Sequence, residues 1–311
     1  EAEDLSGPGS HRCLLPGWDD RPFEIELPAQ ATEPLPVVIA FHGGGGNANG
    51  AIQITCPGGD RTHPDCLDHL ALARGYAVVV PNGTGARPTR NSRTWNGGGG
   101  TAGYYCSAGP ACKSGVDDMA FMDDLMEEVS RIAPIDPQRV FVTGLSNGAS
   151  MSYRVACERP TTTRAVAAIG GPSQHAESGG RCIGGTPILH IHGTDDPCAP
   201  WDDATDISCS GVALGGVKIG VPRTIEGWRV RNSCDSATDT VPLPDLDDSD
   251  GSTAIHHRYL GCDAAVELIE IEGGGHTWPG GDQYLPIDQI GRLNLDLHAS
   301  ERILDFFDGA P

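Results

Sequence analysis

Residues 140–151 read VFVTGLSNGASM and join two local patterns. The first residues are apolar and partly β-branched, as in a buried strand, whereas the last ones suit a helix. Between them lies a Gly-x-Ser-x-Gly motif, with Gly144 and Gly148 on either side of Ser146. A serine in such a strand-to-helix turn projects its hydroxyl beyond the sheet, at the positive end of the helix. Ser146 is therefore a candidate nucleophile, although a glycine-rich turn with a helix-capping serine would give the same motif.

Strand-like and helix-like segments alternate along the rest of the chain. This alternation predicts an α/β fold with a mostly parallel central sheet and helices on both faces. We expect an irregular segment over residues 1–20 and a single domain over residues 21–311, because no linker or internal repeat divides the chain. Strands are predicted near residues 21–27, 35–41, 76–80, 140–145, 164–171, 186–191, 253–260 and 264–271, and helices near 66–74, 115–132, 147–158, 222–231 and 299–307.

An acidic segment at residues 235–251 is predicted to be an irregular loop. Its aspartates resemble a calcium-binding loop at first sight, but the glycine falls one position late and the closing glutamate is missing. We therefore expect a solvated loop without a bound metal.

The charge balance limits the partners of the chain. The 311 residues include 21 Lys and Arg against 42 Asp and Glu, for a net charge of −21. Nucleic acids and anionic membranes both repel such a surface, so neither is expected as a partner. No apolar run approaches the roughly 20 residues that a membrane span requires. The sequence begins EAED without an apolar signal segment, so we expect that any secretion signal has been removed.

The chain has 11 cysteines, a density that favours an oxidising, extracellular location over a reducing compartment. They lack the tight paired spacing of a zinc site. Pairing each cysteine with its neighbour leaves Cys13 over, unless it displaces another partner. The predicted disulfides are Cys56–Cys66, Cys106–Cys112, Cys157–Cys182, Cys198–Cys209 and Cys234–Cys262.

Two other strand ends supply the partners that a serine nucleophile needs. A serine hydroxyl requires a base, and His276 follows the last long strand between glycines and a threonine. An imidazole base requires a carboxylate, and Asp195 and Asp196 both follow the predicted strand at 186–191. The order Ser, Asp, His suits an α/β-hydrolase. His190 and His192 are better explained as hydrogen-bonded core histidines, and His298 has no strand before it.

The predicted strand at 35–41 ends in HGGGG, residues 42–46. Each glycine costs backbone entropy, so the run suggests a close approach of backbone amides to a ligand. In the hydrolase geometry one N–H of this loop and the N–H after the nucleophile bind the oxyanion. Here these are the amides of Gly44, with Gly43 as the near alternative, and Asn147. His42 precedes the loop and could orient it or line the site.

Four segments resemble the secreted esterase and polyhydroxybutyrate depolymerase family, which includes feruloyl esterases. They are Leu145–Cys157, Val38–Gly44, HGTxDP at 192–197 and GGHTWPG at 274–280, and together the resemblance extends from about residue 20 to 307. It implies an α/β-hydrolase fold for residues 21–311 and a triad of Ser146, Asp196 and His276, with Asp196 rather than Asp195 as the acid.

The resemblance also implies that Trp95 and Trp278 line the acyl pocket. From its place before the glycine loop, His42 is expected as a further substrate contact. It predicts a secreted carboxylesterase that requires no metal or organic cofactor. Feruloyl-type esters of the plant cell wall are the favoured substrates, and polyhydroxybutyrate or another polyester is the alternative. A non-catalytic binding protein on the same fold, or a serine peptidase, would be the alternatives of another class. The sequence does not specify the oligomeric state.

Overall fold

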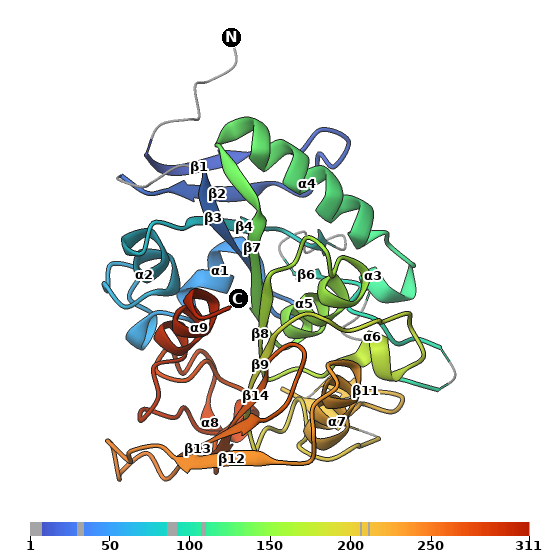
Figure 1. Cartoon of the computed structure of the whole chain (residues 1–311), viewed down its shortest axis with the longest axis vertical. Helices are drawn as coiled ribbons and strands as arrows, with labels where there is room; N and C mark the ends of the chain where they lie inside the picture. The colour runs from blue at the N-terminus through green and yellow to red at the C-terminus, as the bar shows by residue number, and fades with distance from the viewer. Residues whose placement is uncertain are drawn as a thin grey trace.

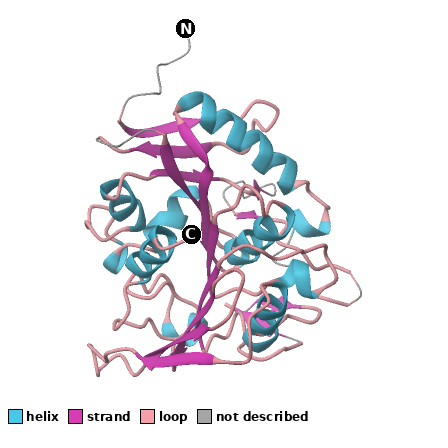
Figure 2. Cartoon of the chain, in the orientation of Figure 1, coloured by secondary structure: helices cyan, strands magenta, loops and turns pink. Residues whose placement is uncertain are grey.

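The computed structural model describes residues 8–29, 34–85, 92–101, 103–106, 110–205, 207–210 and 212–310. Its main feature is a sheet of ten strands among these residues, in the order β1-β2-β4-β3-β7-β8-β9-β14-β13-β12. The sheet runs through the molecule in Figure 1, and Figure 2 shows helices on both of its faces. The predicted α/β class and mostly parallel sheet are confirmed.

Six central strands are parallel to one another and carry the chemistry-bearing turns at their carboxyl ends. Their side chains are largely buried because helices cover both faces, which explains the continuous apolar runs in the sequence. These strands are β4 (Ala77–Pro81), β3 (Leu35–Phe41), β7 (Ile135–Leu145), β8 (Ala165–Ile169), β9 (Ile188–Gly193) and β14 (Val266–Glu272).

Antiparallel strands extend the sheet at both edges. They are β1 (Gly9–Cys13) and β2 (Phe23–Leu27) at one edge, and β13 (Thr253–Tyr259) and β12 (Thr238–Pro242) at the other. Two small hairpins lie outside the sheet, formed by β5 (Thr84–Gly85) with β6 (Arg93–Thr94) and by β10 (Ile207–Cys209) with β11 (Val212–Leu214).

Two of these strands correct the sequence predictions. Residues 9–13 pair with β2, so the segment 1–20 is not irregular throughout; residues 1–7 lie outside the described residues. Residues 238–242 pair with β13 inside the predicted acidic loop. All five residues of β12 are exposed, so this edge strand lacks the alternation of buried and exposed positions that reveals a strand in sequence.

The helices form two layers, and each layer has its own apolar core. One core packs α1 (Ala48–Gln53), α2 (Leu67–Ala73) and α9 (Ala299–Asp308) against the sheet. The other packs α4 (Asp118–Ile132), α5 (Asn147–Glu158) and α7 (Val221–Arg231) against the opposite face, as Figure 1 shows. Successive residues of β3 point to opposite faces of the sheet and so pack in different cores. Val38 belongs to the first core, and Val37 and Ile39 belong to the second.

Short helices complete the set of described helical segments. They are η1 (Pro57–Gly59), α3 (Pro110–Lys113), α6 (Gln174–Glu177) and α8 (Ile287–Ile290). The helix predicted near residues 115–132 is α4, which begins three residues later than predicted. Asp117 is the N-cap, and its carboxylate accepts a hydrogen bond from the Ala120 amide.

All five predicted disulfides are present, and none of their cysteines lies in a strand of the ten-stranded sheet. Cys13 is the free cysteine of the described residues, and it is buried. Burial, followed by the charge of Glu128, raises the pKa of its thiol to about 11. The pairs are Cys56–Cys66, Cys106–Cys112, Cys157–Cys182, Cys198–Cys209 and Cys234–Cys262.

Among the described residues, no helix is both long and apolar enough to cross a bilayer.

Candidate active site

Ser146 lies in the tight turn between β7 and α5. Its φ of 61° and ψ of −118° place it in a region that residues with side chains rarely adopt. The flanking glycines are required for space. A Cβ on Gly148 would lie 2.3 Å from the Phe41 carbonyl oxygen, and one on Gly144 would lie 2.6 Å from the same atom. Close packing of α5 on β3 therefore holds the serine in its strained conformation.

The ends of β9 and β14 bring an acid and a histidine together. His276 Nδ1 and Asp196 Oδ2 lie 2.6 Å apart, although 80 positions separate the residues in sequence. Both residues are buried, whereas Asp195 is exposed. The structure therefore brings Asp196, rather than Asp195, to the histidine. Backbone hydrogen bonds from Cys198 and Ala199, at 2.8 and 2.7 Å, fix the other carboxylate oxygen of Asp196.

Neighbouring charges keep the buried Asp196 ionised. Burial alone would raise the pKa of this carboxyl, but the His276 ring, then His192 and the Ala199 amide, lower it overall. An ionised acid accepts the Nδ1–H of His276 and leaves Nε2 able to accept a proton. The pair is thus set up as a base with a fixed tautomer.

A row of buried polar groups lies behind this pair. His192 Nε2 donates to the Ala199 carbonyl at 2.7 Å, so its Nδ1 accepts from His190 Nε2 at 2.9 Å. His190 Nδ1 in turn accepts from the Tyr153 hydroxyl at 2.8 Å. Burial lowers the pKa of both histidines, which keeps them neutral near pH 7. The two histidines therefore lie in the core with their ring nitrogens hydrogen-bonded.

The glycine loop after β3 lies beside Ser146. Gly43 and Gly44 both line the cavity that contains the serine. The loop is held by hydrogen bonds from Gly45 to the Arg93 carbonyl and from Gly46 to the Gly43 carbonyl, at 2.8 and 3.0 Å. The backbone of Asn147 follows the serine in the first turn of α5.

The Asn147 side chain is buried and turned toward Trp95. Its amide oxygen accepts from the Trp95 backbone N–H at 2.7 Å, and its amide nitrogen donates to the Trp95 carbonyl at 3.0 Å. The asparagine thus clamps the segment around Trp95 onto the start of α5. Sequence reasoning placed only its backbone in the site.

His42 lines the cavity, but both of its ring nitrogens contact backbone atoms. Nδ1 donates to the Gly43 carbonyl at 2.7 Å, and Nε2 accepts from the Gly83 amide at 3.0 Å. Burial lowers the pKa of His42 to about 4, so the ring is neutral. These contacts make it a loop-orienting residue, and its role as a substrate contact stays a prediction because the ring also lines the cavity.

The two tryptophans predicted in the acyl pocket are packing residues instead. Trp95 and Trp278 are 0% and 2% exposed, and neither lines the cavity. Trp95 Nε1 donates to the His42 carbonyl at 3.1 Å, and Trp278 Nε1 donates to Ser300 Oγ at 3.1 Å. Both rings therefore support the site from the layer behind it.

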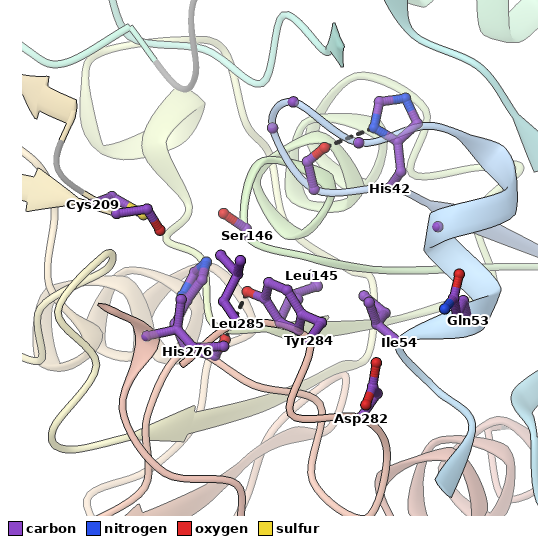
Figure 3. Close-up of a pocket in the computed structure, with 17 residues that line it drawn as sticks. His42, Gln53, Ile54, Leu145, Ser146, Cys209, His276, Asp282, Tyr284 and Leu285 are labelled. Carbon is purple, nitrogen blue, oxygen red and sulfur yellow. Dashed lines mark hydrogen bonds between the residues drawn. The ribbon is translucent and has the colours of Figure 1, made fainter. Parts of the chain in front are cut away.

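The cavity has a volume of about 460 Å³, within the range of small-molecule sites. Ser146 and His276 share one part of its wall in Figure 3, and among the described residues no hydrogen bond yet joins their side chains. Such contacts commonly tighten only when substrate binds. The other lining residues are His42, the glycines at 43–46, Gly50, Gln53, Ile54, Leu145, Cys209, Ser210, Asp282, Tyr284, Leu285 and Ile290.

Most of the residues that line the cavity could not be predicted from a sequence motif. Ile54, Leu285 and Ile290 come from loops and helix ends that are remote from the strand motifs. Tyr284 was likewise missed, and its hydroxyl donates to the His276 carbonyl at 2.9 Å. This bond ties the loop after Trp278 to the histidine.

One group of side chains among the described residues has the spacing of metal ligands, namely Cys56, Cys66 and Asp68. The two cysteines are joined in a disulfide and offer no thiolates. In the acidic loop, Asp247 and Asp250 instead accept hydrogen bonds from Ser249 and Ser252 two residues onward.

Comparison with known proteins gives the class of the chain. The family model described as phospholipase/carboxylesterase matches residues 119–207, which include the serine turn. The acetyl xylan esterase structure from Aspergillus awamori superposes with a TM-score of 0.55 at 14% identity, over 96% of this chain and 99% of that one. The fold is therefore that of the α/β-hydrolases.

Sequence relatives narrow the class to esterases. Feruloyl esterase C of Emericella nidulans is 29% identical over 262 residues, covering 82% of this chain and 76% of that protein. NocK of Nocardia uniformis subsp. tsuyamanensis, an esterase by name, is 29% identical over 201 residues, covering 62% of this chain. That match spans 57% of the length of NocK. The chain is a carboxylic ester hydrolase with an α/β-hydrolase fold, and its sequence is similar to feruloyl esterases.

Proposed function

We propose that the chain is a serine carboxylesterase that uses Ser146 as nucleophile, His276 as base and Asp196 as the orienting acid. The observation that carries this proposal is the 2.6 Å contact between His276 and Asp196 at the cavity that also contains the strained Ser146. A nucleophile, a base and an orienting acid at adjacent strand ends are what acyl transfer to a serine requires.

In this mechanism Ser146 Oγ attacks the ester carbonyl carbon, and its proton passes to His276 Nε2. The amides of Gly44 and Asn147 stabilise the oxyanion, with Gly43 as the neighbouring alternative. The bond to the alcohol then breaks, and His276 returns the proton to the leaving oxygen. Water attacks the acyl-enzyme by the same route in reverse, which releases the acid and restores the Ser146 hydroxyl.

The proposed natural substrates are feruloyl-type esters, with hydroxycinnamate released from the plant cell wall. Support comes from the similarity to Feruloyl esterase C and from a cavity large enough for an aromatic acyl group. We further propose that the protein acts outside the cell, because five disulfides would not persist in a reducing compartment.

The test compares the wild type with Ser146→Ala and with Ser130→Ala, a matched control on the exposed side of α4. Each protein is assayed with p-nitrophenyl acetate and with methyl ferulate. We expect Ser146→Ala to lose roughly four to six orders of magnitude in kcat, and Ser130→Ala to match the wild type. Retained activity in Ser146→Ala would reject the nucleophile.

The substrate part of the proposal has its own test. Release of ferulate is compared with release of 3-hydroxybutyrate from a polyhydroxybutyrate film. Rapid clearing of the film without ferulate release would reject the feruloyl assignment and favour the polyester alternative. Failure of the wild type with every ester would reject catalysis and favour a binding protein on this fold.

A further inference from the structure

The cavity has two chemically different ends. Ser146 and His276 occupy one end, whereas Figure 3 shows Gln53 and Asp282 on the side away from them. Apolar side chains, including Ile54 and Leu145, line the region between. An acyl group bound at the serine would therefore meet first an apolar passage and then a polar end.

The polar end is held in place by the backbone. The Asp282 amide donates to the Ile54 carbonyl at 3.1 Å, which puts this aspartate next to the end of α1 and thus beside Gln53. The preceding Gly281 carbonyl accepts from the Gly58 amide at 3.2 Å. A Cβ on Gly59 would lie only 2.9 Å from Asp282 Oδ2, so this glycine leaves room for the carboxylate.

The Asp282 carboxylate has no partner among the described residues: none of them donates a hydrogen bond to it or forms an ion pair with it. It is nevertheless partly buried, and burial raises its pKa above the usual aspartate value. A half-buried carboxylate that faces a cavity without a donor can accept a hydrogen bond from a ligand. Among the described residues that line the cavity there is no lysine or arginine, so the Asp282 carboxylate would repel an acyl group with an anionic end.

A hydroxycinnamoyl group has the matching order of chemistry. Its ester carbonyl is followed by a flat apolar unit and then by a phenolic hydroxyl at the far side of the ring. A phenol is a strong donor to a carboxylate, and such charge-assisted bonds are stronger than neutral ones. A 3-hydroxybutyryl chain offers no phenol to this end.

We propose that Asp282, assisted by Gln53, accepts the ring hydroxyl of the acyl group and selects hydroxylated cinnamoyl esters over their unhydroxylated or methylated analogues. This assignment of a specificity-determining residue rests on the proposed esterase function, because it takes the acyl carbonyl to lie at Ser146. It adds a reason for the substrate preference that the triad alone does not supply.

The test uses two matched pairs of methyl esters at pH 6.5, where the phenol keeps its proton. One pair is 4-hydroxycinnamate and cinnamate, and the other is ferulate and 3,4-dimethoxycinnamate. For each pair, kcat/KM for the hydroxylated ester is divided by kcat/KM for its analogue. This ratio is measured in the wild type, Asp282→Asn, Asp282→Ala and Gln53→Ala. Asp288→Asn, an exposed aspartate of α8 outside the cavity lining, is the control.

We expect the wild type and Asp288→Asn to favour the hydroxylated ester by roughly tenfold to a hundredfold, as for a hydrogen bond to a charged group. Asp282→Ala should bring both ratios close to one. Asp282→Asn keeps an acceptor oxygen without the charge, so its ratios should fall in between. Thermal melting of each variant shows that it is folded, and the ratio within one variant is independent of the active fraction.

Unchanged ratios in Asp282→Ala and Asp282→Asn would overturn the proposal, as would a wild type with no preference within either pair. These results differ from failure of the proposed function itself. In that case the wild type would cleave none of the four esters, or Ser146→Ala would cleave them as well as the wild type does.

Discussion

Lys218 is a buried cation beside Asp196, the proposed catalytic acid, and its replacement should change how stability depends on pH. It is 7% exposed, its ammonium group donates to the Cys198 carbonyl, and the Tyr105 ring lies 5.5 Å away. Burial lowers the pKa of Lys218 from 10.5 to about 8, although the charge of Asp196 opposes this shift. We predict that Lys218→Met removes a pH-dependent penalty on folding.

The size of the effect follows from the two pKa values. Below about pH 8 the lysine is protonated in both states, and the folded state bears a penalty of about 3 kcal/mol. Between about pH 8 and 10.5 the unfolded chain binds more protons than the folded one, so the free energy of unfolding rises with pH. Integration from pH 7 to pH 10 gives a gain on the order of 2 to 3 kcal/mol from this residue.

Urea unfolding at pH 7 and pH 10, followed by tryptophan fluorescence with the disulfides intact, measures this gain. The increase in the free energy of unfolding between the two pH values should be on the order of 2 to 3 kcal/mol larger in the wild type than in Lys218→Met. Other titrating groups act in both proteins and cancel in the comparison. Lys113→Met replaces the only other lysine of the chain, which is exposed, and should behave as the wild type does.

Equal pH dependence in the wild type and Lys218→Met would refute the reasoning, because it would mean that folding does not perturb this ammonium group. If the free energy of unfolding rose more in Lys218→Met than in the wild type between pH 7 and pH 10, the effect of the lysine would have the opposite sign to the one predicted.

Two further predictions concern the triad and the cysteines. Asp196→Asn should lower kcat for p-nitrophenyl acetate by about 10⁴-fold, because an amide NH₂ facing His276 favours the tautomer that cannot accept the Ser146 proton; a loss of less than tenfold would contradict this role. Ellman's reagent should find one thiol, that of Cys13, in the unreduced protein unfolded in urea and none in the folded protein, since this thiol is buried. Two or more thiols in the unfolded protein would contradict the observed pairing.

The fold and the candidate triad could be predicted because their signals are local. The apolar residues of β7, the two glycines of the serine turn and the start of α5 occupy one short stretch of sequence. Steric contact explains its composition, since Gly148 lies against the Phe41 carbonyl and leaves no space for a side chain. Parallel strands then place Asp196 and His276 at the same sheet edge, so their position after apolar strands was informative.

The edge strands lacked a comparable signal. Residues of β12 are all exposed, and β1 is mostly exposed or half-buried, so neither shows the alternation that reveals a strand with one buried face. Their pairing depends on β13 and β2, which are neighbours in space. Such strands are defined by backbone hydrogen bonds that any side chain permits.

The roles of the tryptophans could not be read from the sequence for a related reason. An aromatic residue in a long loop can face either the cavity or the core. The observed direction of Trp95 depends on the Asn147 amide, which holds its backbone, and on the His42 carbonyl, which accepts from its ring nitrogen. Neither contact is implied by the spacing of the three residues.

The proposed catalytic residues and the proposed specificity residues therefore lie on different kinds of structural element. Ser146, Asp196 and His276 lie at strand ends inside a tightly packed sheet, where the glycine contacts leave little freedom to change. Gln53 lies at the end of α1 and Asp282 in a loop, and the backbone bond from Asp282 to Ile54 holds the two segments together. Substitutions at this second pair would alter the far end of the cavity without disturbing the serine turn. Proteins of this fold could thus keep one reaction while the loop residues change which acyl group they accept.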